Sequence, residues 1–136
     1  MRKILISSHS RYPVDRKNLR RRVVDFLYES GIKEDYELGI FFVGDRKMKL
    51  LNQRFMKHDG TTDVLSFPMS GFEKGKKEET HYWPAVKESK GLELGEIVLS
   101  YPRAIRQAMK KGSTVDAEVE FLVLHGLKHL LGFHHE

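Results

Sequence analysis

Residues 125–136 read HGLKHLLGFHHE and contain four of the seven histidines in the chain. His125 and His129 are four residues apart, which places both imidazoles on one face of a helix, about one turn from each other. Gly132 can take the left-handed backbone conformation that commonly ends a helix, so the chain can turn back after it. His135 would follow that turn and arrive close enough to be a third ligand. The stretch therefore predicts a metal site built from a helix and the turn that ends it.

Three neutral imidazoles with one position left to water are typical of a catalytic zinc site, because structural zinc sites fill all four positions with protein ligands. The spacing of the three histidines around Gly132 is that of the zinc-protease motif HExxHxxGxxH. That motif needs a Glu directly after the first His as the general base, and this chain has Gly126 there. The metal geometry is retained, whereas the chemistry of peptide hydrolysis is not. Two other interpretations stay open: a fortuitous histidine cluster, and His134 as the third ligand.

The composition predicts a globular protein of one domain, residues 1–136, with 40% hydrophobic and 32% charged residues. The net charge of +5 favours a polyanionic partner, although many basic proteins bind none. Cysteine is absent, so neither disulfides nor thiolate ligands contribute. The N-terminal apolar run is too short for a signal peptide, and no stretch approaches the length of a membrane span. We therefore expect a cytoplasmic protein.

Strand and helix signals alternate along the chain. Four apolar segments are predicted as strands: residues 4–6, 38–43, the core of 61–68, and 94–99. Four segments have helical spacing: Asp15, as N-cap, to about Ser30; about Arg46 to Lys57, capped by Asp45; Pro102 to Gly112; and about Val115 to Leu131. Residues 70–91 are polar and are expected to form a surface loop. The order predicts an α+β fold in which a mixed sheet of about four strands packs with helices.

The last helix is apolar nearly all round beyond its first turn, so we expect it to be central and buried. Phe121 lies on one of its apolar sides. Ser113 or Thr114 is predicted as its N-cap, with Asp116 placed for a capping box with Ser113. In the preceding helix, one side carries the apolar residues Ala104, Ile105, Ala108 and Met109.

Three segments resemble one protein family. HGLKHLLGFHH resembles the HGxLHLxGYDH signature of the YbeY family, LNQRFMKHDGTTDVLSFP resembles its LNxxYRxxDxPTDVLSFP segment, and LGEIVLS resembles its LGDIxIS strand. The resemblance implies a zincin-like α+β domain with one Zn²⁺ held by His125, His129 and His135. It further implies a metal-dependent endoribonuclease that cleaves single-stranded RNA in ribosomal RNA maturation, with the ribosome or its small subunit as a partner.

Three of the chain's departures from the family pattern bear on the predicted site. His134 stands where the family has Asp, and Lys128 stands where Leu is usual. Met56 stands where the family has an Arg that is expected to contact RNA phosphate. Arg54 and Lys57 flank Met56, so a basic group remains nearby.

The leading hypothesis is zinc-dependent cleavage of single-stranded RNA. The expected nucleophile is zinc-bound hydroxide, acting alone or with His134, Asp63 or Glu96 as a general base. The basic candidates for holding phosphate are Arg54, Lys57 and Arg103. One rival is a zinc protease, which Gly126 disfavours. The other is a non-catalytic module that binds RNA or the ribosome around a structural metal, which three rather than four ligands disfavour.

Overall fold

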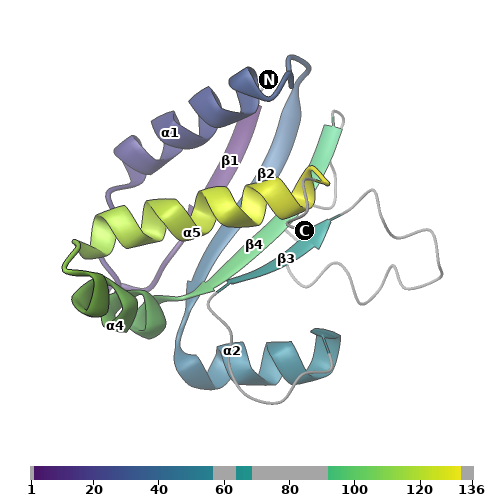
Figure 1. The fold of residues 1–136 in the computed structure, drawn as a ribbon. Coiled ribbons are helices and arrows are strands. Elements are labelled where there is room, and N and C mark those ends of the chain that lie inside the picture. Colours follow the sequence, from purple (N-terminus) through teal and green to yellow (C-terminus); the bar gives the residue numbers. More distant parts are fainter. Residues whose placement is uncertain (1, 57–63, 69–91, 133–136) are drawn as a thin grey trace.

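The computed structural model describes residues 2–56, 64–68 and 92–132. Four strands form one mixed sheet in the order β1-β2-β4-β3 (Figure 1). The strands are β1 (Arg2–Ser7), β2 (Tyr36–Val43), β3 (Val64–Pro68) and β4 (Leu92–Ser100). β1, β2 and β4 are parallel, and β3 pairs antiparallel with β4 at the edge of the sheet. The predicted α+β class and mixed four-stranded sheet are confirmed.

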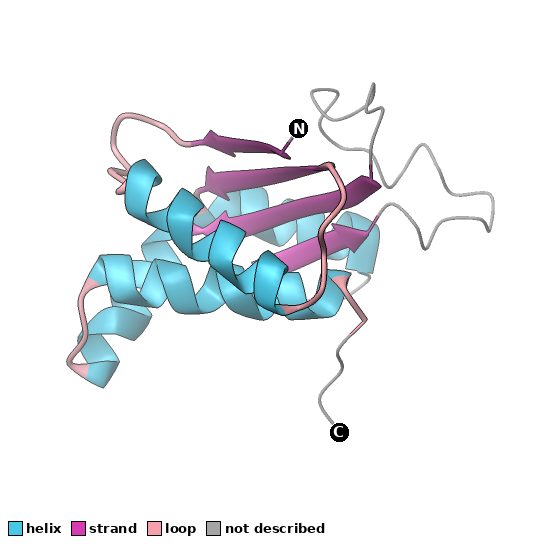
Figure 2. Ribbon diagram, turned by 90° about the horizontal axis from the view of Figure 1, so that it is seen from above, coloured by secondary structure: helices cyan, strands magenta, loops and turns pink. Residues whose placement is uncertain are grey.

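Helices lie on both faces of the sheet (Figure 2). They are α1 (Arg16–Glu29), α2 (Asp45–Leu51), which continues as the π-helix η1 (Asn52–Met56), α4 (Tyr101–Lys111) and α5 (Val115–Leu130). Within the described residues the order of strands and helices is the predicted one. The described helices include none long and apolar enough to cross a membrane.

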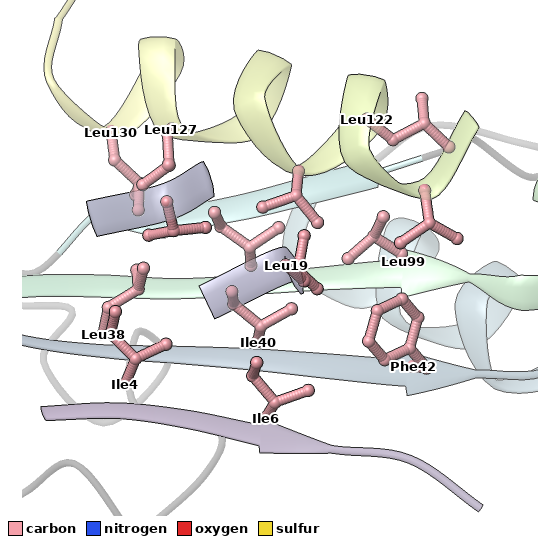
Figure 3. Close-up of a cluster of buried hydrophobic side chains, with 14 of the residues drawn as sticks. Ile4, Ile6, Leu19, Leu38, Ile40, Phe42, Leu99, Leu122, Leu127 and Leu130 are labelled. Carbon is pink, nitrogen blue, oxygen red and sulfur yellow. The ribbon is translucent and has the colours of Figure 1, made fainter. Parts of the chain in front are cut away.

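The larger hydrophobic core lies between the sheet and the pair α1 and α5. Figure 3 shows Leu122, Leu127 and Leu130 of α5 directed at the sheet, where they meet side chains of β1, β2 and β4. A smaller cluster lies on the opposite face, where Met48 and Leu51 of α2 pack on Val98 of β4. Successive residues of a strand point to opposite faces of the sheet, so neighbouring residues of β4 contribute to the two cores in turn. β2 also contributes to both cores, which matches its nearly continuous apolar run over residues 38–43.

Helix α1 begins and ends as its sequence predicts. The carboxylate of Asp15 accepts a hydrogen bond from the backbone N–H of Asn18, 3.2 Å away, and Gly31 follows the helix with a φ of +94°. On its exposed side, Arg20 donates to the backbone carbonyl of Ile4 at 3.0 Å, and Arg16 donates to that of Ile6 at 3.4 Å. Both acceptors belong to β1, the strand at the other edge of the sheet.

Asp45 does not cap α2 as predicted. Gly44 is the N-cap and makes no side-chain bond. The predicted extent of the helix is close to that observed, since the chain is α-helical to Leu51 and then π-helical to Met56. The Asp45 carboxylate instead accepts a hydrogen bond from the Ser100 hydroxyl at 2.8 Å and pairs with Arg106 at 2.9 Å. It therefore ties the start of α2 to the start of α4. The hydrogen bond from Arg106 holds the pKa of Asp45 below its ordinary value.

A depressed pKa in the folded protein means that the Asp45 carboxylate stabilises the fold above the pKa of the unfolded chain, about 4. That contribution is lost as the pH falls through the lower folded-state pKa. We expect Asp45→Asn to lower the free energy of unfolding by about 0.5–1 kcal/mol at pH 7, since the pair is partly exposed. The difference from wild type should shrink below pH 4. Urea unfolding across this range measures it, with Lys3→Gln, which breaks the longer Lys3–Glu37 pair at 3.5 Å, as control. An unchanged difference at pH 3 would contradict the assignment.

Two further local predictions are corrected. Thr114, whose hydroxyl accepts from the backbone N–H of Ala117, is the N-cap of α5, so Asp116 forms no capping box with Ser113. In α4, Ala104 and Ala108 are buried, whereas Ile105 and Met109 are exposed by 38% and 76%. Gly112 ends this helix with a φ of +68°, as predicted.

Candidate metal and RNA site

His125 and His129 lie one turn apart on a flank of α5, and both are partly exposed. Their Nε2 atoms are 3.2 Å apart, and their ring planes meet at 70°. Two ligands at about 2.0–2.1 Å from a tetrahedral zinc ion are roughly 3.3–3.4 Å apart. The spacing of the two nitrogens thus fits a shared metal ion, or a single proton held between them in a hydrogen bond.

Four other candidates for metal binding, catalysis or phosphate contact fall outside the described residues. They are His134 and His135 after α5, and Lys57 and Asp63 before β3. The described residues alone contain no group of three or more His, Cys, Asp or Glu side chains that could hold a metal ion. The pair on α5 is therefore the part of the predicted site that the structure brings together.

Close packing on the sheet explains why the residue after His125 is a glycine, Gly126. A Cβ atom there would lie 3.1 Å from Ile97 of β4 and 3.3 Å from Val64 and Ser66 of β3. The Ser66 hydroxyl also donates a hydrogen bond of 3.2 Å to the Gly126 carbonyl. The helix thus lies closest to the sheet beside His125, and a glutamate after it has no room.

Phe121 continues the line of the two histidines one turn towards the start of α5. Phe121 is 57% exposed, so the expected burial of this helix holds for its face towards the sheet and not for this flank. The ring is nearly parallel to the His125 imidazole, at 18°, with the ring centroids 6.3 Å apart. The Lys111 ammonium lies 4.3 Å from the Phe121 centroid and pairs with Glu118 at 2.9 Å. The spacing of four between Phe121 and His125 was a usable signal for this neighbourhood, and the sequence analysis did not use it.

Glu96 lies away from this flank. It is fully buried on β4. The next residue, Ile97, faces the α5 core, and the cross-strand partner of Glu96 is Phe67 of β3, which belongs to the smaller cluster. Since side chains alternate along a strand, Glu96 points with Val98 to the α2 face, across the sheet from the histidines. This placement gives no support to the prediction that Glu96 acts as a general base at the metal.

The two described RNA-binding candidates also lie apart from the histidines in the fold. Arg54 is exposed on η1, which follows α2 on the other face of the sheet. Arg103 lies in the first turn of α4, and its charge helps lower the pKa of Asp45.

Helix α1 carries a basic cluster, residues 16, 17 and 20–22, that is largely engaged within the protein. Arg16 and Arg20 bind the carbonyls of β1, and Arg22 pairs with Glu120 of α5 at 3.0 Å. Arg21 donates to the side chain of Asn18. These contacts agree with an intramolecular role for most of the cluster.

Comparison with known sequences gives one family. The family profile described as endoribonuclease YbeY matches residues 6–136. The chain is similar to the endoribonuclease YbeY of Anaeromyxobacter sp. (strain Fw109-5), with 36% identity over 97% of this chain and 60% of that protein. It is 33% identical to the endoribonuclease YbeY of Caldicellulosiruptor saccharolyticus, over 99% of this chain and 85% of that protein. The chain thus spans less than two thirds of the first relative and most of the second.

Among solved structures, the fold is similar to a protein of Thermotoga maritima whose solution structure is known. The TM-score is 0.57 at 25% sequence identity, and the match covers 100% of this chain and 75% of that chain. The arrangement of helices and strands described above is thus shared by a protein of independently determined structure.

Proposed function

Because the chain belongs to the endoribonuclease YbeY family, we propose that it is a metal-dependent hydrolase that cleaves single-stranded RNA. The observation that supports this most directly is the 3.2 Å separation of the His125 and His129 Nε2 atoms on an accessible flank of α5. We propose that these two histidines and His135 hold one zinc ion. A bound zinc ion would polarise a phosphoryl oxygen and bring the pKa of a coordinated water near 7, which is the chemistry that phosphodiester hydrolysis needs.

The residues around the histidines would hold them in place for this task. Ser66 binds the carbonyl of Gly126, and Gly126 packs closely on β3 and β4, so the histidine-bearing turn of α5 is fixed to the sheet. Rigid support of this kind keeps metal ligands near their productive geometry. The nucleophile in this proposal is zinc-bound hydroxide, alone or with His134 or Asp63 as general base.

We further propose that the substrate is ribosomal RNA and that the protein acts in the cytoplasm, at the ribosome or its small subunit. The support is the family together with the net charge of +5, which favours a polyanionic partner. Contacts of Arg54, Lys57 and Arg103 with phosphate are part of this proposal.

The test is to measure the zinc content of the purified protein and then its action on labelled single-stranded RNA, duplex RNA and casein. We expect about one zinc per chain and cleavage of the single strand alone, lost on chelation and restored by zinc. Casein should stay intact with every metal, because no residue supplies the base of a zinc protease after His125. Proteolysis that chelator abolishes would favour the protease instead. RNA binding without cleavage, with or without metal, would favour the non-catalytic module.

A further inference from the structure

Three rings follow one another along the flank of α5, at positions 121, 125 and 129. His125 lies 6.3 Å from Phe121 and 4.7 Å from His129, between ring centroids. The two outer members differ in chemistry, because His129 offers a ring nitrogen whereas Phe121 offers only an apolar surface. With 57% of its side chain exposed beside both His125 and Lys111, Phe121 retains room for a ligand.

A cation lies over this ring, on the side chain of Lys111. The Lys111 ammonium is 4.3 Å from the Phe121 centroid, and the Glu118 carboxylate, whose side chain is 3% exposed, holds it at 2.9 Å. An ammonium has three donors, and the single bond to Glu118 leaves capacity for a phosphate oxygen. Lys110 adds a second exposed cation next to it. The flank therefore joins a flat apolar surface to positive charge, which is the chemistry that recognises an unpaired nucleotide.

We propose that Phe121 is the platform on which one unpaired base of the RNA stacks, with the neighbouring backbone phosphate beside Lys111. This inference rests on the proposed function and adds a specificity-determining residue to it. Phe121 is close enough to His125 for the stacked base to belong to a nucleotide that flanks the phosphate at the histidines. In a duplex both faces of each base are already stacked, so the platform selects single strands. An aromatic platform accepts any base, so it selects strandedness rather than sequence.

The chain offers a matched control for this platform. Tyr28 is also an exposed aromatic residue, by 58%, with the Lys33 ammonium 5.4 Å from its ring centroid. It belongs to α1 rather than to the helix that carries the histidines. Tyr28→Ala therefore removes an equivalent aromatic–lysine pair elsewhere on the surface.

The experiment compares wild type, Phe121→Ala, Phe121→Trp and Tyr28→Ala in zinc content, thermal unfolding, RNA affinity at fixed salt, and cleavage kinetics. Phe121→Ala should weaken binding of single-stranded RNA by roughly 5- to 150-fold, the range for loss of one stacked base. KM should rise more than kcat falls, while zinc content and thermal unfolding stay unchanged. Phe121→Trp should bind at least as tightly as wild type, and Tyr28→Ala should match wild type.

A scan of single abasic positions along the RNA identifies the stacked nucleotide. One position should weaken binding to wild type by a similar factor and have no further effect on Phe121→Ala. Two results would overturn the proposed platform. The first is that Phe121→Ala binds RNA as tightly as an active wild type. The second is that Phe121→Ala loses zinc and no abasic position in the RNA weakens binding. The second result would mean that Phe121 only supports His125. If wild type neither binds nor cleaves RNA, the proposed function itself fails.

Discussion

His125→Ala and His129→Ala should each abolish stable zinc binding and lower RNA cleavage by more than about 100-fold. Changes in groups that merely support a metal ligand already reduce metal affinity or activity 10- to 100-fold, so removal of a ligand has the larger effect. Both side chains are partly exposed, so the fold should survive. Zinc content, cleavage rate and unfolding of the zinc-free proteins measure these effects.

The control for the histidine variants is His9→Ala. His9 is exposed in the loop after β1, where its ring accepts a hydrogen bond from the backbone N–H of Arg11. Its replacement should leave zinc content and cleavage unchanged. Full zinc retention by His125→Ala would show that the metal site lies elsewhere. Full retention by His135→Ala alone would move the third ligand to His134 or to another residue.

Gly126→Glu should unfold the protein or destabilise it by several kcal/mol, and should not create a protease. The Cβ atom alone would lie 3.1 Å from the Ile97 side chain and 3.3 Å from Val64 and Ser66, and the carboxylate beyond it would lack water. Overpacking costs about 1–3 kcal/mol, and a buried unpaired charge adds more. Total stabilities are only about 5–15 kcal/mol, so the loss is a large share. Urea unfolding and casein hydrolysis measure the outcome.

Two further variants separate steric conflict from charge. In Gly126→Ala the gain of about 1 kcal/mol in helix propensity offsets part of the overpacking, so its effect should be much smaller. Ala117→Glu places the same carboxylate at an exposed position in the first turn of α5, where it should be neutral or stabilising. A stable Gly126→Glu protein with chelator-sensitive peptidase activity would refute the argument.

The sequence predicted the architecture well because its signals are local and repeated. Asp15 and Gly31 mark the ends of α1, and uninterrupted apolar runs mark the strands buried on both faces. The pairing of the strands could not be predicted in this way. No local pattern shows that β2 and β4 are neighbours or that β3 runs antiparallel at the edge of the sheet. Asp45 was misassigned for a similar reason. Its position before a helix suits a cap, whereas its partners, Ser100 and Arg106, lie far along the chain.

The candidate site was predicted in part. The spacing of four correctly placed His125 and His129 on one flank, because helix geometry alone decides it. The absence of a glutamate at position 126 was visible in the sequence, but its cause, contact with Ile97, depends on how the helix rests on the sheet. The exposure of Phe121 was missed because an apolar pattern shows which side chains can be buried and not which neighbours cover them.

The guanidinium groups of Arg16 and Arg20 in α1, which bind carbonyls of β1, affect whether further strands can add to the sheet. A strand at the edge of a sheet presents unpaired backbone groups to which a strand of another molecule can add. Here the outward carbonyls of Ile4 and Ile6 already accept hydrogen bonds from Arg20 and Arg16. An incoming strand would have to break both bonds and strip water from two positive charges. Growth of the sheet through this side, and with it the stacking of chains into aggregates at high concentration, is therefore opposed by residues that belong to the fold itself.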